Sequence, residues 1–275
     1  MSSTTRPNTP RNRARRHFLG IVAAATAAVT LASLPARAKG SNWWDKHGSD
    51  GGPVRGPKGD GGNCFLRGTS IMTPTGEARI EDLKIGDLVE TMHGRTAPVK
   101  WIGHQRFKKN APAWHESVMP IRVCRYALDE WTPHRDLYLS PNHALLIDGV
   151  LVRVKELVNG VSIAPADFAG CAQLDYYQVL LDTHNVILAE GAPTETLLLR
   201  GSNHECFTNF AEYNRLYPSE QTLTMAPFAP IVGYEGGRAN LKALLRLGVS
   251  PFVQMRDPIQ EAYERIVART EGLAN

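Results

Sequence analysis

The stretch that decides the fold runs from Cys64 to Gly76 and reads Cys-Phe-Leu-Arg-Gly-Thr-Ser-Ile-Met-Thr-Pro-Thr-Gly. It opens with a cysteine and then places apolar and β-branched residues in a short run bounded by glycine and proline, which is typical of a strand. Directly before it, residues 48–62 are rich in glycine, proline and charge, a composition that cannot bury a core. We therefore predict a folded domain that begins at Cys64, after a disordered Gly-rich segment over residues 39–63.

Short strand-like runs continue from Cys64 to residue 201, separated by Gly, Pro and Asp turns. The predicted strands are residues 70–73, 88–91, 98–107, 119–123, 137–139, 144–147, 150–153, 176–181 and 186–189. Asp148-Gly149 lies between two of them and predicts a tight hairpin, because both turn positions must tolerate positive φ. Residues 81–86 predict a short helical turn ended by Gly86. No long helical period occurs, so the region is predicted to be all-β.

The last part of the chain has a different pattern. Residues 241–247 and 258–269 have helical spacing of apolar residues, and Asp257-Pro258 suits a helix start with proline in the first turn. Residues 202–275 are therefore predicted to be a partly helical C-terminal extension that packs on the β-domain or serves as an accessory.

The first 38 residues have the pattern of an export signal. Arg15-Arg16 precedes His-Phe-Leu, an Ala-rich apolar run covers residues 21–34, and Ala36-Arg-Ala supplies small residues for cleavage. The arginine pair resembles a twin-arginine signal, while an ordinary Sec signal or an uncleaved anchor are the alternatives. The apolar run is shorter than the roughly 20 residues that span a bilayer. We expect a periplasmic or secreted protein without stable membrane insertion after signal removal.

The net charge of +4 belongs to this leader. Residues 1–38 contain six arginines and no other charged residue, and subtracting them leaves −2 for the remainder. The mature domain therefore lacks the basic surface charge that nucleic-acid binding requires, and we expect no nucleic-acid partner.

The cysteines favour neither a metal nor a redox cofactor. Cys64, Cys124, Cys171 and Cys206 are widely spaced and form no C-x-x-C pair, so no metal and no cofactor is predicted. A disulfide between Cys171 and Cys206 stays open for an exported protein. Cys124 lies in an alternating apolar run, and we expect it to be a small core residue.

Two further stretches interrupt strands with polar turns. Leu137-Tyr-Leu is followed by Ser140-Pro-Asn-His143, and a later strand ends in Asp182-Thr-His184-Asn185 before the next strand begins.

In their order and rough spacing these motifs resemble the Hint family, the hedgehog/intein self-processing module, and most of all the bacterial stand-alone Hint domains. The matching pieces are Cys64, Gly68-Thr69, Leu83-x-x-Gly86-Asp87, Ser140-x-x-His143 and His184-Asn185 with the strand that follows. The resemblance covers residues 63–201 and implies a horseshoe-like Hint β fold.

The resemblance also implies a reaction. Cys64 would attack the carbonyl of Asn63 through a small ring, so that the Asn63–Cys64 amide becomes a thioester, and proximity makes such an attack efficient. His143 would protonate the departing nitrogen, Ser140 would help hold the scissile peptide, and His184 would have a supporting acid/base role. The substrate would be the protein's own N-terminal segment, and water or an external amine would resolve the thioester.

Full protein splicing is not expected. Splicing needs a terminal Asn followed by Cys, Ser or Thr, whereas residues 190–199 read Glu-Gly-Ala-Pro-Thr-Glu-Thr-Leu-Leu-Leu. The sequence therefore predicts autoproteolytic, cysteine-dependent cleavage or acyl transfer.

Other interpretations remain open. A Cys–His peptidase acting on other proteins would place its cysteine at a helix N-terminus, unlike Cys64. An inactive Hint scaffold could serve as a binding or structural module, with Cys64 a buried thiol and Ser140, His143 and His184 structural. The remaining histidines have no partner pattern and are interpreted as surface groups; these are His17, His47, His93, His104, His115, His134 and His204.

Overall fold

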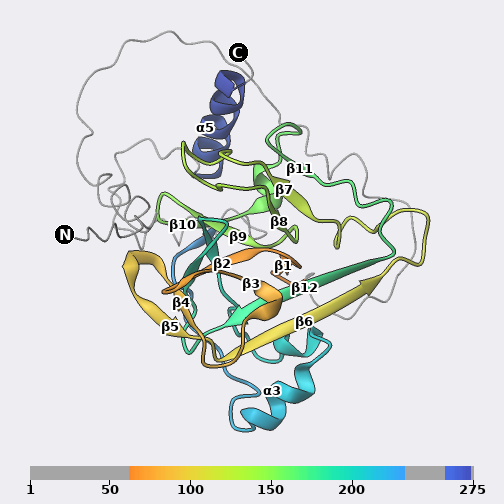
Figure 1. Ribbon diagram of the computed structural model, residues 1–275, viewed down its shortest axis with the longest axis vertical. Coiled ribbons are helices and arrows are strands. Elements are labelled where there is room, and N and C mark those ends of the chain that lie inside the picture. The colour runs from red at the N-terminus through yellow and green to blue at the C-terminus, as the bar shows by residue number, and fades with distance from the viewer. Residues whose placement is uncertain (1–61, 233–257, 274–275) are drawn as a thin grey trace, which may run out of the picture. The chain divides into compact units, whose positions relative to one another are not determined.

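The computed structural model describes residues 62–232 and 258–273 (Figure 1). The predicted leader (1–38), residues 39–61 of the Gly-rich segment and the predicted helix at 241–247 lie outside the described residues. Within the described ranges, no helix has both the length and the apolar character needed to cross a bilayer.

The first of two large sheets is entirely antiparallel and has β1 at an interior position. Its strands, in spatial order, are β11 (Ile163–Pro165), β7 (Ile121–Val123), β8 (Leu137–Leu139), β1 (Phe65–Leu66), β12 (Gln173–Leu180) and β6 (Trp101–Lys108). Phe65 pairs with Tyr177 on one side and with Leu139 on the other. Phe65 is thus fixed from both sides, immediately after Cys64, and Leu66 pairs with Tyr176 of β12.

The second large sheet is antiparallel except at one edge, where β15 pairs with β10 in parallel. Its order is β15 (Ile231–Val232), β10 (Val150–Arg153), β9 (Ala144–Ile147), β14 (Ala192–Glu195), β13 (Val186–Ala189), β2 (Ser70–Thr73) and β3 (Gly76–Arg79). A small third sheet pairs β4 (Leu88–Glu90) with β5 (Thr96–Pro98). Short 3₁₀ turns cover Ile80–Asp82, Met92–Gly94 and Val154–Leu157. The all-β prediction is confirmed.

The chain passes between the two large sheets through short connections. Residues 67–69 join β1 to β2, residues 140–143 join β8 to β9, and residues 181–185 join β12 to β13. The last two connections contain the predicted site residues Ser140, His143 and His184. The fold therefore gathers the polar turns of the sequence where strands leave one sheet and enter the other.

Most predicted strands form. Residues 70–73, 137–139, 144–147, 150–153 and 186–189 are strands with the predicted bounds. The strands that the sequence pattern missed are β1, β3, β5, β11, β14 and β15. These are two to four residues long, and several contain proline or charge, so their alternation is too brief to be recognised.

The turn predictions had mixed outcomes. Asp148 and Gly149 have φ of 50° and 81°, which confirms the tight hairpin. The helical turn covers only Ile80–Asp82, and Gly86 does not end it. Gly86 instead supplies a φ of 91° in the turn that follows, where the amide of Asp87 donates to the carbonyl of Lys84.

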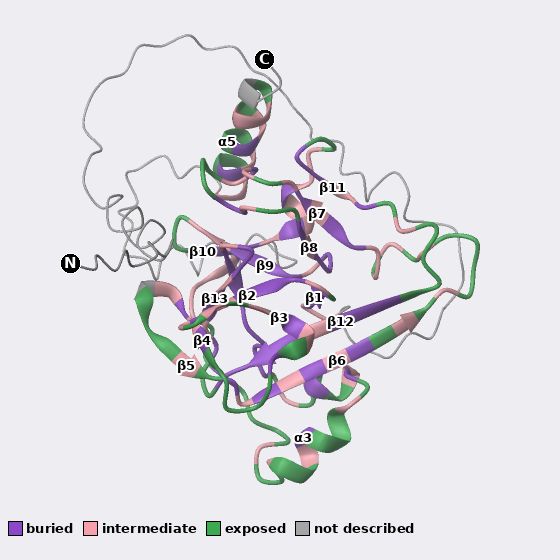
Figure 2. Ribbon diagram, in the orientation of Figure 1, coloured by how far each residue is buried: buried purple, intermediate pink, exposed green. Residues whose placement is uncertain are grey.

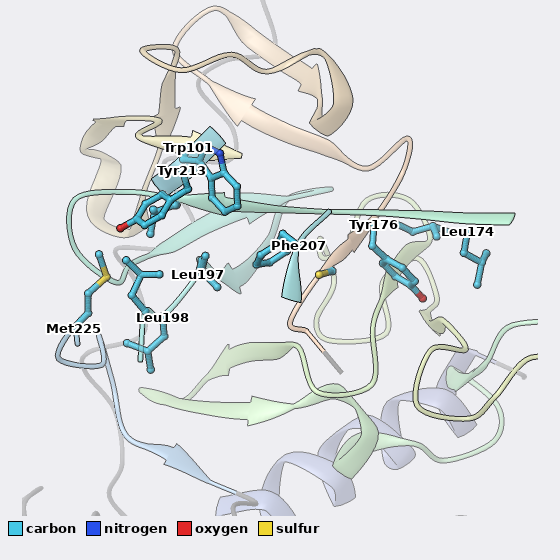
Figure 3. Close-up of a cluster of buried hydrophobic side chains, with 12 residues drawn as sticks. Trp101, Leu174, Tyr176, Leu197, Leu198, Phe207, Tyr213 and Met225 are labelled. Atoms are coloured by element: carbon cyan, nitrogen blue, oxygen red, sulfur yellow. The ribbon is translucent and has the colours of Figure 1, made fainter. Parts of the chain in front are cut away.

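A cluster of buried apolar side chains joins the first sheet to the C-terminal extension (Figures 2 and 3). Trp101 of β6 is fully buried and packs against Phe207 and Tyr213, with ring centroids 5.5 and 5.3 Å away. Cys64 belongs to the same cluster. Burying these large rings is the main favourable term that fixes the extension on β6.

The extension adds polar contacts to this apolar packing. It begins with a 3₁₀ turn, Asn203–Cys206, and helix α3, Phe210–Leu216. The Trp101 indole donates to Glu212 Oε2 at 3.1 Å, and Tyr217 Oη donates to the carbonyl of Lys100 at 2.7 Å. The extension therefore packs on the β-domain, as one of the two predicted alternatives requires.

Helix α5, Pro258–Leu273, contains the predicted helix at 258–269 and continues beyond it. Ala262 and Ile266 are buried, and Arg269 Nε donates to the carbonyl of Tyr126 at 2.6 Å. The Thr270 and Ser162 hydroxyls lie 2.7 Å apart. Burial of these apolar residues, together with polar contacts to the loops that flank β7 and β11, thus holds α5 in place.

Two expectations about single residues were wrong. Cys124 is only partly buried, because it follows the last residue of β7 and its thiol faces the carbonyl of Val161 in the surface turn 159–163. His204 is fully buried rather than exposed, because its ring packs 4.7 Å from Tyr213 and its Nε2 bonds Asn214 Oδ1. All four cysteines are free thiols, so Cys171 and Cys206 are not paired.

We expect Gly103→Ala to destabilise the fold by about 1–3 kcal/mol. A Cβ at this position in β6 would lie 2.6 Å from a ring carbon of the buried Phe207, which has little space to move. Gly170→Ala is the control, since nothing lies within 4 Å of its Cβ position. Urea denaturation measures both variants, and equal midpoints would contradict the packing described here.

Candidate functional site

Cys64 is buried at the start of β1. Its side chain is 2% exposed, and burial raises the pKa of its thiol well above the ordinary value, with a smaller contribution from Cys206. At neutral pH the thiol is therefore protonated and must lose its proton to a neighbouring group before it can attack.

Ser140 holds the backbone on both sides of the Asn63–Cys64 bond. Its hydroxyl donates to the carbonyl of Gly62 at 2.6 Å and accepts from the amide of Cys64 at 2.8 Å. Its own amide donates to the carbonyl of Cys64 at 2.9 Å. Gly62 and Asn63, the last residues of the Gly-rich segment, are thereby held in a fixed conformation at the edge of the domain.

His143 lies three residues along the same turn and is fully buried. Its Nε2 lies 3.0 Å from the carbonyl of Glu195, which can only accept, so Nε2 carries the proton and Nδ1 is unprotonated in the neutral ring. Burial lowers the pKa of His143, although the Glu195 charge and nearby backbone of Cys64 oppose this effect. The ring also packs edge-on against Phe65, 4.4 Å between centroids. His143 thus offers a neutral imidazole with a free basic nitrogen.

Glu195 is the site residue that sequence reasoning missed. It ends β14, is 1% exposed, and its Oε1 accepts from Asn63 Nδ2 at 2.8 Å and from the amide of Ala144 at 2.9 Å. The sequence did contain a signal for it, because Glu195 is the single acidic residue in the otherwise uncharged run 191–199. That run was used above only to show that a splicing junction is missing. A lone carboxylate in a run that is otherwise buried is typically retained for a specific contact.

His184 contacts Glu195 directly. The amide of Phe228 donates to His184 Nδ1 at 2.9 Å, so the ring proton of the neutral tautomer is on Nε2. That nitrogen lies 3.4 Å from Glu195 Oε2, and both side chains are almost fully buried. The structure brings Cys64, Ser140 and His143 together, and it connects His184 to them through Glu195. The acid/base role of His184 stays a prediction.

A small cavity adjoins the thiol. Its lining includes Gly62, Cys64, Ser140, Gln105 and Tyr176. Within the described part of the chain, Gln105 Oε1 is buried without a hydrogen-bond partner. The cavity thus presents an acceptor oxygen beside the Cys64 thiol, in a space where a small polar molecule can bind.

One other cluster has metal-ligand types of side chain. Glu77, His134 and Glu190 place ligand atoms within 4.8 Å of one another. Arg135 Nη1 lies 3.3 Å from Glu77 Oε2 and 3.6 Å from Glu190 Oε2, and therefore already supplies positive charge to both carboxylates. We interpret the cluster as an ion-pair network that fixes the turn between β13 and β14.

A family model described as the Hint domain matches residues 63–201, half of the chain. The chain belongs to the Hint domain family. No curated protein matches it significantly.

Solved structures of low identity are also similar. The MchDnaB-1 intein (N145AA) is 18% identical, with 48% of this chain and 99% of that chain covered and a TM-score of 0.35. A bacterial intein-like domain from Clostridium thermocellum is 14% identical, with 50% and 99% covered and a TM-score of 0.35. A DnaB intein from Synechocystis sp. PCC 6803 is 13% identical, with 50% and 100% covered and a TM-score of 0.36. The family assignment rests on the family model.

We expect Cys64 to react with iodoacetamide at least about tenfold more slowly than Cys171 in the native protein, because alkylation needs an accessible thiolate. Cys64 is buried with a raised pKa, whereas Cys171 is exposed. Peptide mapping after timed alkylation measures both rates, with urea-unfolded protein as the control in which the two should converge. Faster labelling of Cys64 than of Cys171 would contradict the burial of Cys64.

Proposed function

We propose that this Hint domain cleaves its own chain between Asn63 and Cys64 through an N-to-S acyl shift, without splicing. The observation that carries the proposal is the Ser140 hydroxyl, which bonds Gly62 on one side of the scissile peptide and Cys64 on the other. The bond to be broken is thus fixed beside the nucleophile that follows it, the arrangement in which intramolecular attack is most effective.

The first step moves one proton within the site. His143 Nδ1 accepts the proton of the Cys64 thiol, and Sγ forms a bond to the carbonyl carbon of Asn63. The C–N bond of the tetrahedral intermediate then breaks, and the imidazolium returns the proton to the departing nitrogen of Cys64. The products are a thioester between Asn63 and Sγ and a free α-amine on Cys64. The buried, neutral state of His143 supports its role as this internal base.

The second step resolves the thioester. Water or an external amine attacks the Asn63 carbonyl, and Sγ leaves and regains a proton. The cavity beside Cys64 and the acceptor oxygen of Gln105 support the access of such a nucleophile. Splicing is disfavoured because the second sheet continues through β13 and β14, where Glu195 stands in place of a terminal Asn junction.

We further propose that the leader, with its Arg15-Arg16 pair, exports the protein to the periplasm or beyond. The substrate is then the segment that precedes Cys64, released as an acid or transferred to an amine. Residues 39–63 are all that remains of it after signal removal.

We expect purified residues 39–275 to lose the mass of residues 39–63, with hydroxylamine or dithiothreitol accelerating the loss, because both reagents capture thioesters. Intact-mass analysis over time measures it. Cys64→Ala should abolish the loss, and Ser140→Ala and His143→Ala should slow it by about 10²–10⁴-fold each. Cys171→Ala is the matched control and should cleave normally.

A full-length chain under every condition would contradict self-processing. It would instead favour the alternative, an inactive Hint scaffold that serves as a binding or structural module. The observation favouring that alternative is the burial of Cys64, whose protonated thiol resembles a structural core cysteine.

We expect the cleavage rate to stay level from about pH 7 to pH 8.5. Burial lowers the pKa of His143, so the neutral base is lost only below the pH where an ordinary histidine titrates, about 6.5. Burial raises the pKa of Cys64, so no increase should follow the titration of an ordinary thiol near pH 8.5. Timed mass analysis across pH 5–10 measures the profile. A tenfold rise per pH unit up to pH 9 would instead show that solvent deprotonates Cys64.

A further inference from the structure

The contact between Asn63 and Glu195 lies on the acyl side of the proposed scissile bond. It involves none of Cys64, Ser140 and His143. Asn63 Nδ2 donates to Glu195 Oε1 at 2.8 Å. Glu195 is 132 residues away in sequence and comes from the second sheet, whereas Asn63 leads into the first sheet. The side chain of the residue before Cys64 is therefore held by a dedicated group of the domain.

The carboxylate of Glu195 depends on its donors, because a buried charge is tolerated only when hydrogen bonds or ion pairs replace its water. Oε1 receives the amide of Ala144 and the carboxamide of Asn63. Oε2 faces His184 Nε2 at 3.4 Å. The Ala144 amide and the His184 ring belong to the folded domain, whereas Asn63 belongs to the segment that cleavage would release.

Glu195 is also connected to the rest of the site through its backbone. Its carbonyl accepts from His143 Nε2 and thereby sets the orientation of the ring that faces the Cys64 backbone. Behind it, His184 is held by the amide of Phe228. One residue thus fixes both the acyl donor and the proton-transfer group.

We propose that Glu195 is a positioning and specificity residue that selects a hydrogen-bond-donating side chain, such as Asn, immediately before Cys64 and disfavours an acidic one. The inference rests on the proposed self-cleavage, since it names the segment class that the same site accepts. When the segment ends in Asn, the contact with Glu195 holds the backbone carbonyl of residue 63 beside Cys64. Segments ending in Asp place a second carboxylate against Glu195.

Substitutions at position 63 test the selection. Asn63→Leu keeps the shape and removes the donor, and we expect cleavage to slow by about tenfold. Asn63→Asp keeps the shape and adds like charge, and we expect about a hundredfold loss at pH 7.5. The rates of hydroxylamine-induced cleavage of the wild-type chain and of the two variants are measured by intact-mass analysis over time.

The pH dependence separates charge selection from a structural effect. Two facing carboxylates raise the pKa of one of them, so the penalty of Asn63→Asp is present at neutral pH and is relieved as the pH falls and one oxygen takes up a proton. The rate of Asn63→Asp relative to Asn63→Leu should therefore rise at least about fivefold between pH 7.5 and pH 5. A constant ratio, or equal rates for all three chains, would overturn the inference while leaving self-cleavage intact.

A second measurement does not need cleavage. In the Cys64→Ala background, the urea midpoint of Asn63→Asp should lie below that of Asn63→Leu at pH 7.5 and approach it at pH 5. If the wild-type chain never cleaves but this difference is found, the contact is selective and the proposed function fails. If the midpoints coincide at both pH values, Glu195 does not select residue 63 and the inference fails.

Discussion

The pairing of β1 between β8 and β12 is the constraint on which the site depends. A strand of two residues has little stability by itself, yet Phe65 pairs with Tyr177 and with Leu139 in an interior position of the sheet. Because the register is fixed from both sides, the residue before Phe65 has one position only. Leu139 is also the last residue before Ser140, so the same pairing brings the Ser140 hydroxyl to the Asn63–Cys64 peptide.

Burial then determines the chemistry that this geometry permits. The thiol of Cys64 is kept protonated and the imidazole of His143 is kept neutral by the same low-dielectric surroundings. In the proposed acyl shift, a proton would pass between these two groups without creating a lasting buried charge, since it would be returned to the departing nitrogen. The buried carboxylate of Glu195 receives two hydrogen bonds on Oε1, and its Oε2 lies 3.4 Å from His184 Nε2, so this side chain is suited to hold its neighbours rather than to react.

Much of this site was predictable because its residues follow from local chemistry. A cysteine at the boundary of a Gly-rich segment and a Ser-x-x-His turn between strands are visible in the sequence, and the strands that flank the turn formed as predicted. Glu195 was not predictable in this way. Its role depends on Thr194 pairing with Leu145, which brings the end of β14 beside the start of β9. Such a pairing between two strands far apart in the sequence leaves no periodic signal in either segment, and β14 with its proline was not recognised as a strand.

Residues beyond the family match also contribute to the core and to the site. The Hint match ends at residue 201, but Phe207 packs on Gly103 of β6 and Phe228 bonds the imidazole that faces Glu195. β15 follows directly and extends the second sheet by pairing with β10. The segment 202–232 therefore completes the hydrophobic core at one end and the hydrogen bonds of the site at the other. In this chain, the unit that positions Cys64 is larger than the Hint domain that the family pattern delimits.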